Sequence, residues 1–328
     1  MTKVLLLGLG RWGVNHLRNL NSMPVELYVA EVDAKRLEPA RKLGLPEARL
    51  TTKYQDWLSK VDCVVVVTPA RTHFPICQEV LAAGKDVFVE KPITLVSDQA
   101  RKLTELAEKK QRILQVGHIF RFDPASQWLR GAIQAGRFGR VRMLRSNFSG
   151  FKRPRSDSGI MFADAIHFVD LFNYFMDAKP TRVFAATHDF LGRGMEDASL
   201  LSLEYKGGPG VAWATVETNY FLPGKFREVI VIGSQLSAVC DYNVAQYKIK
   251  TFANHHVKEG TEFKAVEGTL HQVETPPEEP LLAELRAFID TVQTRKAPRP
   301  DGQAGVDSVR VIEAAMESAK TGRIVELV

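Results

Sequence analysis

A glutamate, a lysine and a proline that follow a short apolar strand are the first residues in this chain that could do chemistry. The strand is expected at residues 86–89, and Glu90, Lys91 and Pro92 come directly after it. A strand this hydrophobic should be buried, so the charged pair must emerge at the edge of a sheet. In open α/β sheets, ligands bind at that edge, beside the carboxyl ends of the strands. Lys91 is therefore either a surface charge or a catalytic group.

A glycine-rich segment near the amino terminus could hold the phosphates of a dinucleotide. It spans residues 8–13 and has the pattern G-x-G-x-x-G, between a strand-like run and a helix-like run. Gly8 allows a tight turn, Gly10 lets the backbone approach a pyrophosphate, and Gly13 lets helix and strand pack closely. The phosphates would lie at the positive end of the helix, where unpaired N–H groups point outward.

An acidic residue, Glu31, ends the second apolar run at residues 25–30. In a dinucleotide-binding unit, a carboxylate at this place accepts hydrogen bonds from the adenosine ribose hydroxyls. It would repel a 2′-phosphate, so the sequence favours NAD over NADP. The alternative is a solvated acid at a strand end.

The first third of the chain alternates between strand and helix patterns, which must position these residues. Further strands are expected at residues 48–51, 62–67 and 112–116, and a helix is expected from His73 to a C-cap glycine, Gly84. A run of four valines within residues 62–67 is typical of a parallel strand that is buried on both faces. This alternation predicts a doubly wound parallel sheet.

Length and composition limit the number of domains, the kinds of partner and the location that can be expected. At 328 residues the chain suits two domains, and its 44 basic and 38 acidic residues are scattered. Without a basic cluster or a recognition motif, a nucleic-acid partner is not expected. No apolar run reaches the roughly 18 residues of a membrane helix. The three cysteines are far apart, so we expect no metal site and a reducing, cytoplasmic location.

Several motifs together resemble one enzyme family. The G-x-G-x-x-G segment, then Thr68-Pro69 with His73 following, then Glu90-Lys91-Pro92, resemble the glucose-fructose oxidoreductase / inositol dehydrogenase / rhizopine-catabolism family of sugar dehydrogenases. The resemblance implies a Rossmann NAD-binding domain at residues 1–121. It also implies a substrate-binding and oligomerisation α/β domain at residues 122–328, with a large, mostly antiparallel open sheet. The free face of that sheet would join a homodimer or homotetramer.

The resemblance also assigns roles to the motif residues. Lys91 would lie beside the nicotinamide and the substrate hydroxyl, and the peptide bond to Pro92 is often cis in the family. The expected cofactor-binding residues are Gly8, Gly10, Arg11, Trp12, Gly13, Glu31, Thr68, Pro69, His73, Glu90 and Lys91.

A narrower similarity lies at residues 116–124, which read V-G-H-I-F-R-F-D-P. This segment resembles V-G-H-x-x-R-F-N-P in the branch that acts on UDP-N-acetylhexosamines, including 3-dehydrogenases, although Asp123 replaces the asparagine. It implies substrate contacts for His118 and Arg121. The alternative is that Asp123 and Pro124 merely cap the following helix. Free sugars or polyols such as inositol stay open as substrates.

A basic loop at residues 150–159 could contact an anionic substrate. Arg153 and Arg155 could clamp a diphosphate bidentately, or the loop could simply be a solvated basic segment. The resemblance favours ligand contact, with Arg155 ahead of Arg153.

A mainly apolar helix is expected after this loop, with polar residues at every third position. Asp164, His167, Asp170 and Asn173 would share roughly one face, where they line a cavity or pair with a neighbour. The family has an aspartate four residues before a histidine that matches His167, but Ala163 occupies the aspartate position. Asp164 is rotated by about 100° from it, so its substitution for that aspartate stays open.

These residues suggest reversible hydride transfer between a sugar secondary alcohol and C4 of a nicotinamide. We assign His167 as general acid and base because its reference pKa, about 6.5, suits proton transfer near neutral pH. Lys91 would hydrogen-bond the reacting oxygen and share the proton relay. The opposite assignment, with Lys91 as the base, stays open. The rival is a non-catalytic NAD-binding sugar sensor, which would not need Lys91 and His167 but would tolerate Ala163.

Overall fold

The computed structural model describes residues 1–207, 209–296 and 300–327, and these divide into two compact units. The first unit comprises Met1–Phe122 and Glu279–Val309, and the second comprises Asp123–Glu278 and Arg310–Val328. The sequence-based expectation is a boundary between two domains at residues 121 and 122. That boundary stays a prediction.

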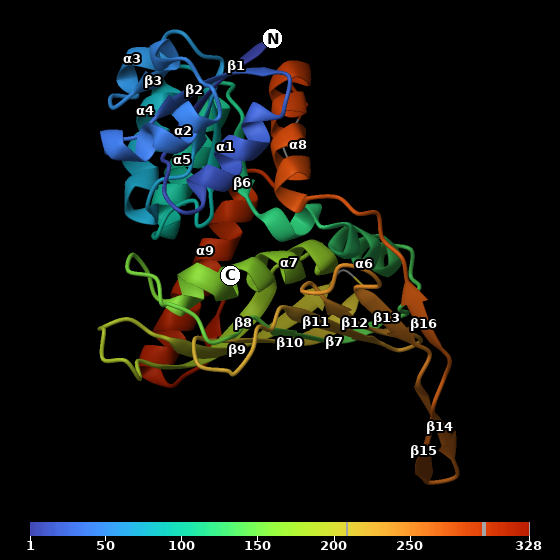
Figure 1. The fold of residues 1–328 in the computed structure, drawn as a ribbon. Helices are drawn as coiled ribbons and strands as arrows, with labels where there is room; N and C mark the ends of the chain where they lie inside the picture. Colours follow the sequence, from blue (N-terminus) through green and yellow to red (C-terminus); the bar gives the residue numbers. More distant parts are fainter. Residues whose placement is uncertain (208, 297–299, 328) are drawn as a thin grey trace. The chain divides into compact units, whose positions relative to one another are not determined.

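A parallel sheet forms the centre of the first unit (Figure 1). Its strand order is β3-β2-β1-β4-β5-β6, with all neighbours parallel. The strands are β1 (Thr2–Leu7), β2 (Val25–Ala30), β3 (Leu50–Thr51), β4 (Cys63–Val66), β5 (Asp86–Glu90) and β6 (Leu114–Gly117). The order reverses between β1 and β4, and ligands of such sheets bind at the carboxyl edge of this switch point. The predicted doubly wound sheet is confirmed.

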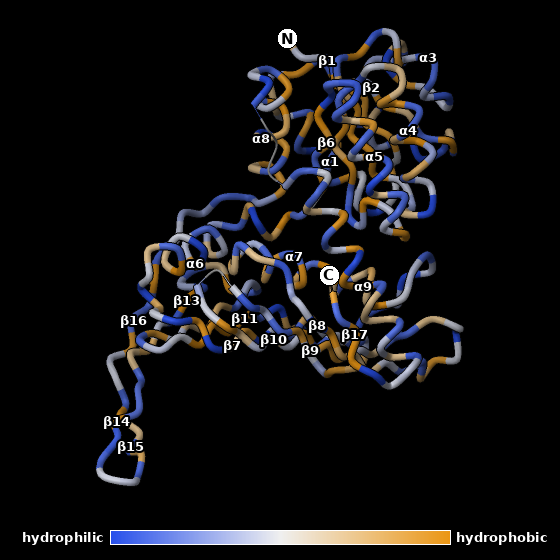
Figure 2. The backbone as a smooth tube through the Cα atoms, turned by 180° about the vertical axis from the view of Figure 1, so that it is seen from behind, coloured by the Kyte–Doolittle hydropathy of each residue, from blue (hydrophilic) through white to orange (hydrophobic). Residues whose placement is uncertain are grey.

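Helices cover the parallel sheet and bury its apolar strands. They are α1 (Gly13–Asn21), α2 (Glu38–Lys42), α3 (Gln55–Leu58), α4 (His73–Ala82), α5 (Ser97–Lys109) and α8 (Pro280–Thr294). All residues of β4 and β5 are buried, as expected for parallel strands covered on both faces. Figure 2 shows apolar stretches inside this unit, where β1 and β6 run.

Helix α8 belongs to the core of the first unit although it lies far along the chain. Leu285 and Phe288 are fully buried in the same apolar cluster as Val65 and Phe88. The rings of Phe88 and Phe288 lie 5.7 Å apart between centroids, edge to face. Burial of this apolar face against the sheet stabilises the position of α8.

A large open sheet forms the second unit, and its predicted, mostly antiparallel character is confirmed. Its order in the described residues is β16-β13-β12-β11-β7-β10-β9-β8-β17, with only the β7–β10 pair parallel. The strands are β7 (Val141–Asn147), β8 (Pro180–His188), β9 (Ala198–Gly207), β10 (Gly210–Asn219), β11 (Glu228–Gly233), β12 (Ser237–Asp241), β13 (Ile249–Phe252), β16 (Leu270–Val273) and β17 (Val325–Glu326).

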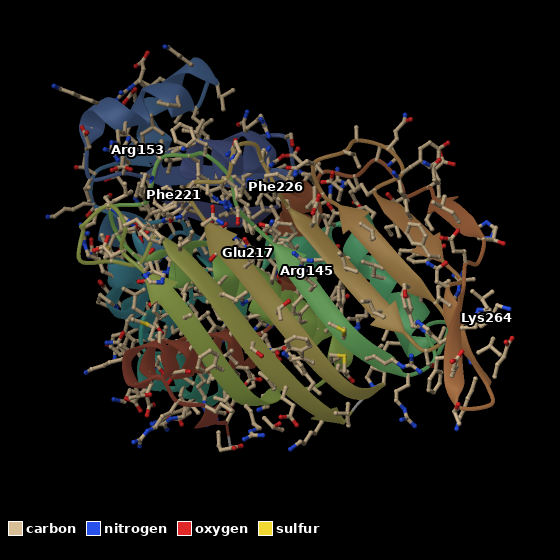
Figure 3. All side chains as sticks on the ribbon, turned by 90° about the horizontal axis from the view of Figure 1, so that it is seen from below. Arg145, Arg153, Glu217, Phe221, Phe226 and Lys264 are labelled. Atoms are coloured by element: carbon tan, nitrogen blue, oxygen red, sulfur yellow. The ribbon has the colours of Figure 1, made fainter. Side chains whose placement is uncertain are left out.

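Helices α6 (Pro124–Gln134) and α7 (Ile166–Met176) lie on one face of this sheet (Figure 1). Along β9, inward residues are buried and the intervening ones are partly or fully exposed, which is the pattern of a sheet covered on one side. Figure 3 shows the open face, with Arg145 and Glu217 on the neighbouring strands β7 and β10. Helix α9 (Gly302–Thr321) contributes to both units.

Two features of the second unit differ from the sequence-based expectation. The helix expected from residue 160 begins as a π-helical turn at Met161–Ala165 and becomes α-helical only in α7. Residues 243–278, which carry little pattern, contain β13, β16 and a separate hairpin of β14 (His255–Glu259) and β15 (Glu262–Val266). The hairpin is exposed along almost its whole length, so no buried face imposes a pattern on it.

No helix among the described residues combines the length and the apolar character needed to cross a membrane.

Candidate active site

The glycine-rich loop between β1 and α1 is a tight turn that requires its first and last glycines. Gly8 has a φ of +95°, and a Cβ there would lie 2.7 Å from the carbonyl oxygen of Val67. A Cβ on Gly13 would lie 2.0 Å from the carbonyl oxygen of Gly8. Gly10, by contrast, has no atom within 4 Å of such a Cβ, so its backbone is open to a ligand.

The carboxylate of Glu31 is built into this loop. It is buried at the end of β2 and accepts hydrogen bonds from the backbone N–H groups of Leu9 (2.7 Å) and Asp33 (3.1 Å). It is therefore not the solvated acid of the alternative interpretation. A carboxylate has about four acceptor positions, so these two bonds leave capacity for ribose hydroxyls.

Glu90 connects the end of β5 to the glycine-rich loop and α1. Its Oε1 accepts a hydrogen bond from Trp12 Nε1 at 2.7 Å and lies 2.7 Å from His16 Nε2. An ionised carboxylate only accepts hydrogen bonds, so Nε2 carries the proton in this contact. Glu90 Oε2 accepts from the backbone N–H of Lys91 at 3.2 Å. The residue that precedes the candidate catalytic lysine is thus held by the dinucleotide loop.

The environment of Glu90 favours its charged form. Burial opposes ionisation, but the hydrogen bonds from His16 and Trp12 and the positive charge of Lys91 outweigh it and hold the pKa of Glu90 below its usual value. His16 was not among the predicted site residues. The available signal was a histidine one turn into α1, on the helix face that the amphipathic pattern buries.

His73 holds the other side of the Glu90-Lys91-Pro92 segment. Its Nδ1 lies 2.8 Å from the carbonyl oxygen of Pro92, and its Nε2 lies 2.8 Å from the carbonyl oxygen of Thr68. The Lys91–Pro92 peptide bond is cis, as the family resemblance implied. These contacts bring Thr68, His73 and Lys91 to the carboxyl ends of β4 and β5.

His118 and Arg121 follow the neighbouring strand β6. His118 is buried, and its carbonyl oxygen accepts a hydrogen bond from the backbone N–H of Arg121 at 3.0 Å. Asp123 caps α6 by accepting from the N–H of Ala125 at 2.9 Å, and Lys248 Nζ lies 2.7 Å from its other oxygen. The capping interpretation of Asp123 is therefore confirmed, while substrate roles for His118 and Arg121 stay predictions.

His167 lies at the start of α7 in the second unit, beside an aromatic ring. Its ring centroid is 5.8 Å from that of Phe148. Asp164 is buried and forms an ion pair with Lys152 at 2.8 Å. Ala163, at the position of the family aspartate, is also buried. Lys152 comes from the basic loop, so this loop and the helix meet near His167.

The predicted single polar face of this helix holds only in part. Because Asp164 lies in the π-helical turn, which has more residues per turn than an α-helix, the three-residue spacing to His167 does not follow α-helical geometry. Asn173 accepts a hydrogen bond from the hydroxyl of Tyr205 at 2.8 Å inside the core. Asn173 is thus a satisfied core residue.

The two loop arginines differ in their contacts. Arg155 donates from Nε and Nη2 to the two oxygens of Asp157, both at 2.9 Å. This bonding raises the pKa of Arg155, although burial opposes the rise. Asp157 therefore occupies the fork that would clamp a diphosphate. Arg153 is exposed, at the end of the sheet where Figure 3 also shows Phe221 and Phe226.

A basic residue that the sequence did not single out, Arg227, lies close to His167's aromatic neighbour. Its guanidinium carbon is 4.9 Å from the centroid of the Phe148 ring. Nothing in the local sequence distinguishes Arg227 from the other basic residues, because its position depends on the pairing of β11 with β7.

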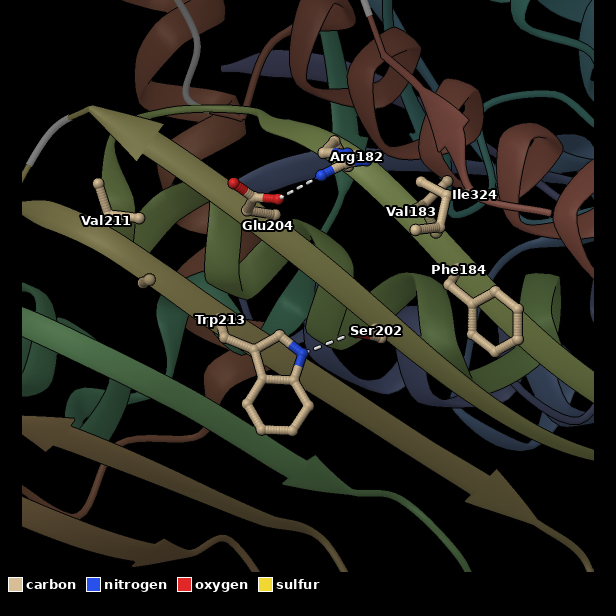
Figure 4. A pocket seen from close by; sticks show the side chains of 9 residues that line it. Arg182, Val183, Phe184, Ser202, Glu204, Val211, Trp213 and Ile324 are labelled. Carbon is tan, nitrogen blue, oxygen red and sulfur yellow. Dashed lines mark hydrogen bonds and ion pairs between the residues drawn. The ribbon is translucent and has the colours of Figure 1, made fainter.

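A hollow on the open face of the large sheet contains none of these candidate catalytic residues (Figure 4). Val211 and Trp213 contribute apolar surface to it, and Trp213 Nε1 donates to Ser202 Oγ at 2.7 Å. Among the described residues no cluster of histidine, cysteine and acidic side chains could hold a metal ion, and all three cysteines are buried.

Comparisons with known proteins identify the family to which both parts of the chain belong. Residues 2–118 match the model of an oxidoreductase family with an NAD-binding Rossmann fold, and residues 130–327 match that family's C-terminal alpha/beta domain. The chain is 29% identical to scyllo-inositol 2-dehydrogenase (NAD(+)) of Bacillus subtilis, covering 98% of this chain and 95% of that protein. It is 26% identical to UDP-N-acetylglucosamine 3-dehydrogenase of Acidithiobacillus ferrooxidans, covering 95% and 94%. The solved structure of GenD2 from gentamicin A biosynthesis in complex with NAD is similar, with a TM-score of 0.83, 26% identity, and coverage of 100% and 96%.

Proposed function

The chain belongs to the Gfo/Idh/MocA oxidoreductase family, and from this premise we propose that it oxidises a nucleotide-linked hexosamine at C3, reversibly, with NAD. At the coarser level it is a sugar or polyol oxidoreductase with a nicotinamide cofactor. The observation that carries the proposal is the hydrogen bonding of Glu90 to Trp12 and His16, because it ties the residue that precedes Lys91 to the dinucleotide loop.

The proposed chemistry divides between two residues. NAD, when bound, supplies a hydride acceptor at C4. His167 takes the hydroxyl proton as the C–H hydride leaves the same carbon, because the ordinary pKa of histidine, about 6.5, suits reversible proton transfer. Lys91 hydrogen-bonds the reacting oxygen and shares the proton. Asp164, paired with Lys152, contributes negative charge on the His167 side.

The preference for NAD rests on Glu31. Its buried carboxylate lies against the N–H of Leu9, inside the glycine-rich loop. A negative charge at this place attracts ribose hydroxyls and repels the 2′-phosphate of NADP.

The substrate class rests on the segment at residues 116–124 and on the similarity to a UDP-N-acetylglucosamine 3-dehydrogenase. The basic residues near His167 suit an anionic substrate. A second candidate is a free polyol, favoured by the higher identity to an inositol dehydrogenase. A sensor that binds NAD and sugar without turnover is the third.

One experiment separates these candidates. The protein is incubated with NAD and either UDP-N-acetylglucosamine or scyllo-inositol, and NADH is followed by its absorbance. NADH formation with the nucleotide sugar, with a 3-keto product identified by mass spectrometry and NMR, supports the proposal. Turnover of the polyol alone favours the second candidate. Binding of either compound in calorimetry without NADH formation favours the sensor.

We further propose that the enzyme is cytoplasmic and forms a homodimer or homotetramer through the open face of the large sheet. Free, buried cysteines suit a reducing compartment. The open face carries apolar side chains such as Val211 and Trp213, which a partner copy would cover.

A further inference from the structure

Two cations of the second unit share one aromatic ring. Arg227 precedes β11, and Lys152 lies in the loop after β7. The guanidinium carbon of Arg227 is 4.9 Å from the centroid of Phe148, and Lys152 Nζ is 4.4 Å from the same centroid. Both distances are in the range of a cation–π contact. The ring alone does not neutralise two positive charges.

Only one of these cations has a carboxylate partner. Lys152 pairs with Asp164 at 2.8 Å. In the described part of the chain, no acidic side chain lies within ion-pair distance of Arg227, and its buried Nε makes no hydrogen bond. Asp157, an acid of the loop that carries Lys152, is held by Arg155. The site is therefore one negative charge short.

This arrangement disfavours the charged form of Arg227. Burial lowers the pKa of its guanidinium, and the charge of Asp164 only partly opposes this. A cation that is partly removed from water without a bonded anion is destabilising. Arg227 would recover that free energy from a ligand that carries a negative charge.

The same ring connects this charge to the candidate catalytic histidine. Phe148 packs against His167 with a centroid distance of 5.8 Å. Arg227, Lys152 and His167 thus border one side chain. A group bound by Arg227 would belong to the molecule whose hydroxyl faces His167.

We propose that Arg227, with Lys152, binds an anionic group of the substrate, either a carboxylate on the sugar or a phosphate attached to it. A guanidinium can bind both groups bidentately, which an ammonium cannot do. This inference rests on the proposed sugar oxidoreductase function. It moves the main anion contact from Arg155, whose fork is occupied by Asp157, to a residue of another loop.

The test compares charged and neutral probes on the full chain loaded with NADH. Calorimetry measures the Kd of glucuronate, glucose 6-phosphate, UDP-N-acetylglucosamine and scyllo-inositol for the wild type, Arg227→Gln and Arg227→Lys. Arg142→Gln, an exposed position on β7, is the control that removes the same charge. We expect Arg227→Gln to raise the Kd of at least one charged probe by roughly tenfold to a hundredfold. Arg227→Lys should raise it less, and Arg142→Gln should leave it unchanged.

The pattern across probes identifies the group that is bound. Loss confined to glucuronate indicates a carboxylate, whereas loss confined to the phosphorylated probes indicates a phosphate. The proposal is overturned if no charged probe binds the wild type, or if Arg227→Gln affects scyllo-inositol as much as the charged probes. If Arg227→Gln does not fold, Arg227→Lys must show the selective loss.

NADH formation in parallel samples, which contain NAD in place of NADH, separates this inference from the proposed function. Selective loss of a charged probe without turnover of any substrate would support the anion site and contradict the oxidoreductase assignment. If Arg227→Gln turns over substrate and binds every probe as the wild type does, the oxidoreductase assignment is supported and the anion site is contradicted.

Discussion

The carboxylate of Glu90 and the imidazole of His16 form a buried pair at 2.7 Å, across 74 residues of sequence. Trp12 donates to the same carboxylate oxygen, and the backbone N–H of Lys91 donates to the other. The dinucleotide loop, helix α1 and the candidate catalytic lysine therefore form one hydrogen-bonded network. The loop and the backbone of Lys91 are thus joined through a single carboxylate.

Replacement of His16 by alanine should destabilise the protein substantially. The charge of Glu90 would stay buried and lose its strongest partner, a change that costs about 3–5 kcal/mol in buried ion pairs. Urea unfolding at neutral pH measures the loss. The control is His16→Gln, whose amide can still donate to Glu90 and should recover part of the stability. Equal unfolding midpoints for His16→Ala and the wild type would contradict the role given to this pair.

The free energy of unfolding should depend on pH below neutrality partly because of Glu90. Because the pKa of Glu90 is lower in the folded chain than in the unfolded chain, the ionised form stabilises the fold. This contribution is complete above the ordinary glutamate pKa, about 4.3, and is lost as pH falls through the folded value. Unfolding free energies between neutral pH and acid should therefore fall more steeply for the wild type than for Glu90→Gln. Parallel curves for the two proteins would show that Glu90 does not contribute.

Replacement of His167 or Lys91 by alanine should reduce turnover by about 10²–10⁴, the usual contribution of general acid–base catalysis. The hydrogen bonds from Trp12 and His16 to Glu90 persist in both variants, so NADH should bind with nearly unchanged Kd in fluorescence titrations. His167→Ala should also remove a limb near neutral pH from the kcat profile. Full activity of His167→Ala would transfer the role of base to Lys91.

The residues of the first unit were predictable because their signals are local. A buried parallel strand is apolar along its whole length, so β4 and β5 are visible in sequence, and the residues that follow them must lie at the sheet edge. Gly8 and Gly13 are fixed by backbone geometry, which allows no other residue. The position of Glu90 and Lys91 after β5 made them candidates, and their proposed roles come from the family resemblance.

The contacts that were missed depend on tertiary pairing. The amphipathic pattern of α8 shows which face is apolar, but not that Phe288 meets Phe88 rather than the second sheet. Likewise, His16 and Arg227 acquire their roles from Glu90 and Phe148, which lie on other elements. The exposed hairpin β14–β15 was missed because it buries no face that would impose a period on its sequence.

Cofactor preference should respond to Glu31. Wild-type protein should bind NADH more tightly than NADPH, because the buried carboxylate repels the 2′-phosphate. Glu31→Ala should weaken the binding of NADH and bring the Kd values of NADH and NADPH closer together. Glu31→Gln keeps the size of the side chain and tests the charge alone. An unchanged ratio in both variants would mean that Glu31 serves only the backbone N–H of Leu9.

The oligomeric state should depend on the open face of the large sheet. Val211 and Trp213 on β10 remain 62% and 50% exposed, and Phe184 on β8 adds further apolar surface to the same hollow (Figure 4). Covering these side chains with a second copy would remove apolar area from water, at about 25 cal/mol per Å². Sedimentation velocity should show a dimer or tetramer for the wild type and a smaller species for Val211→Lys/Trp213→Lys.

The matched control for this prediction lies on the hairpin. Phe263 on β15 is also well exposed, so Phe263→Lys introduces the same charge at an apolar surface position away from the hollow. We expect Phe263→Lys to sediment like the wild type. A monomeric wild type would contradict the proposed assembly, and dissociation by Phe263→Lys alone would transfer the interface from the sheet to the hairpin.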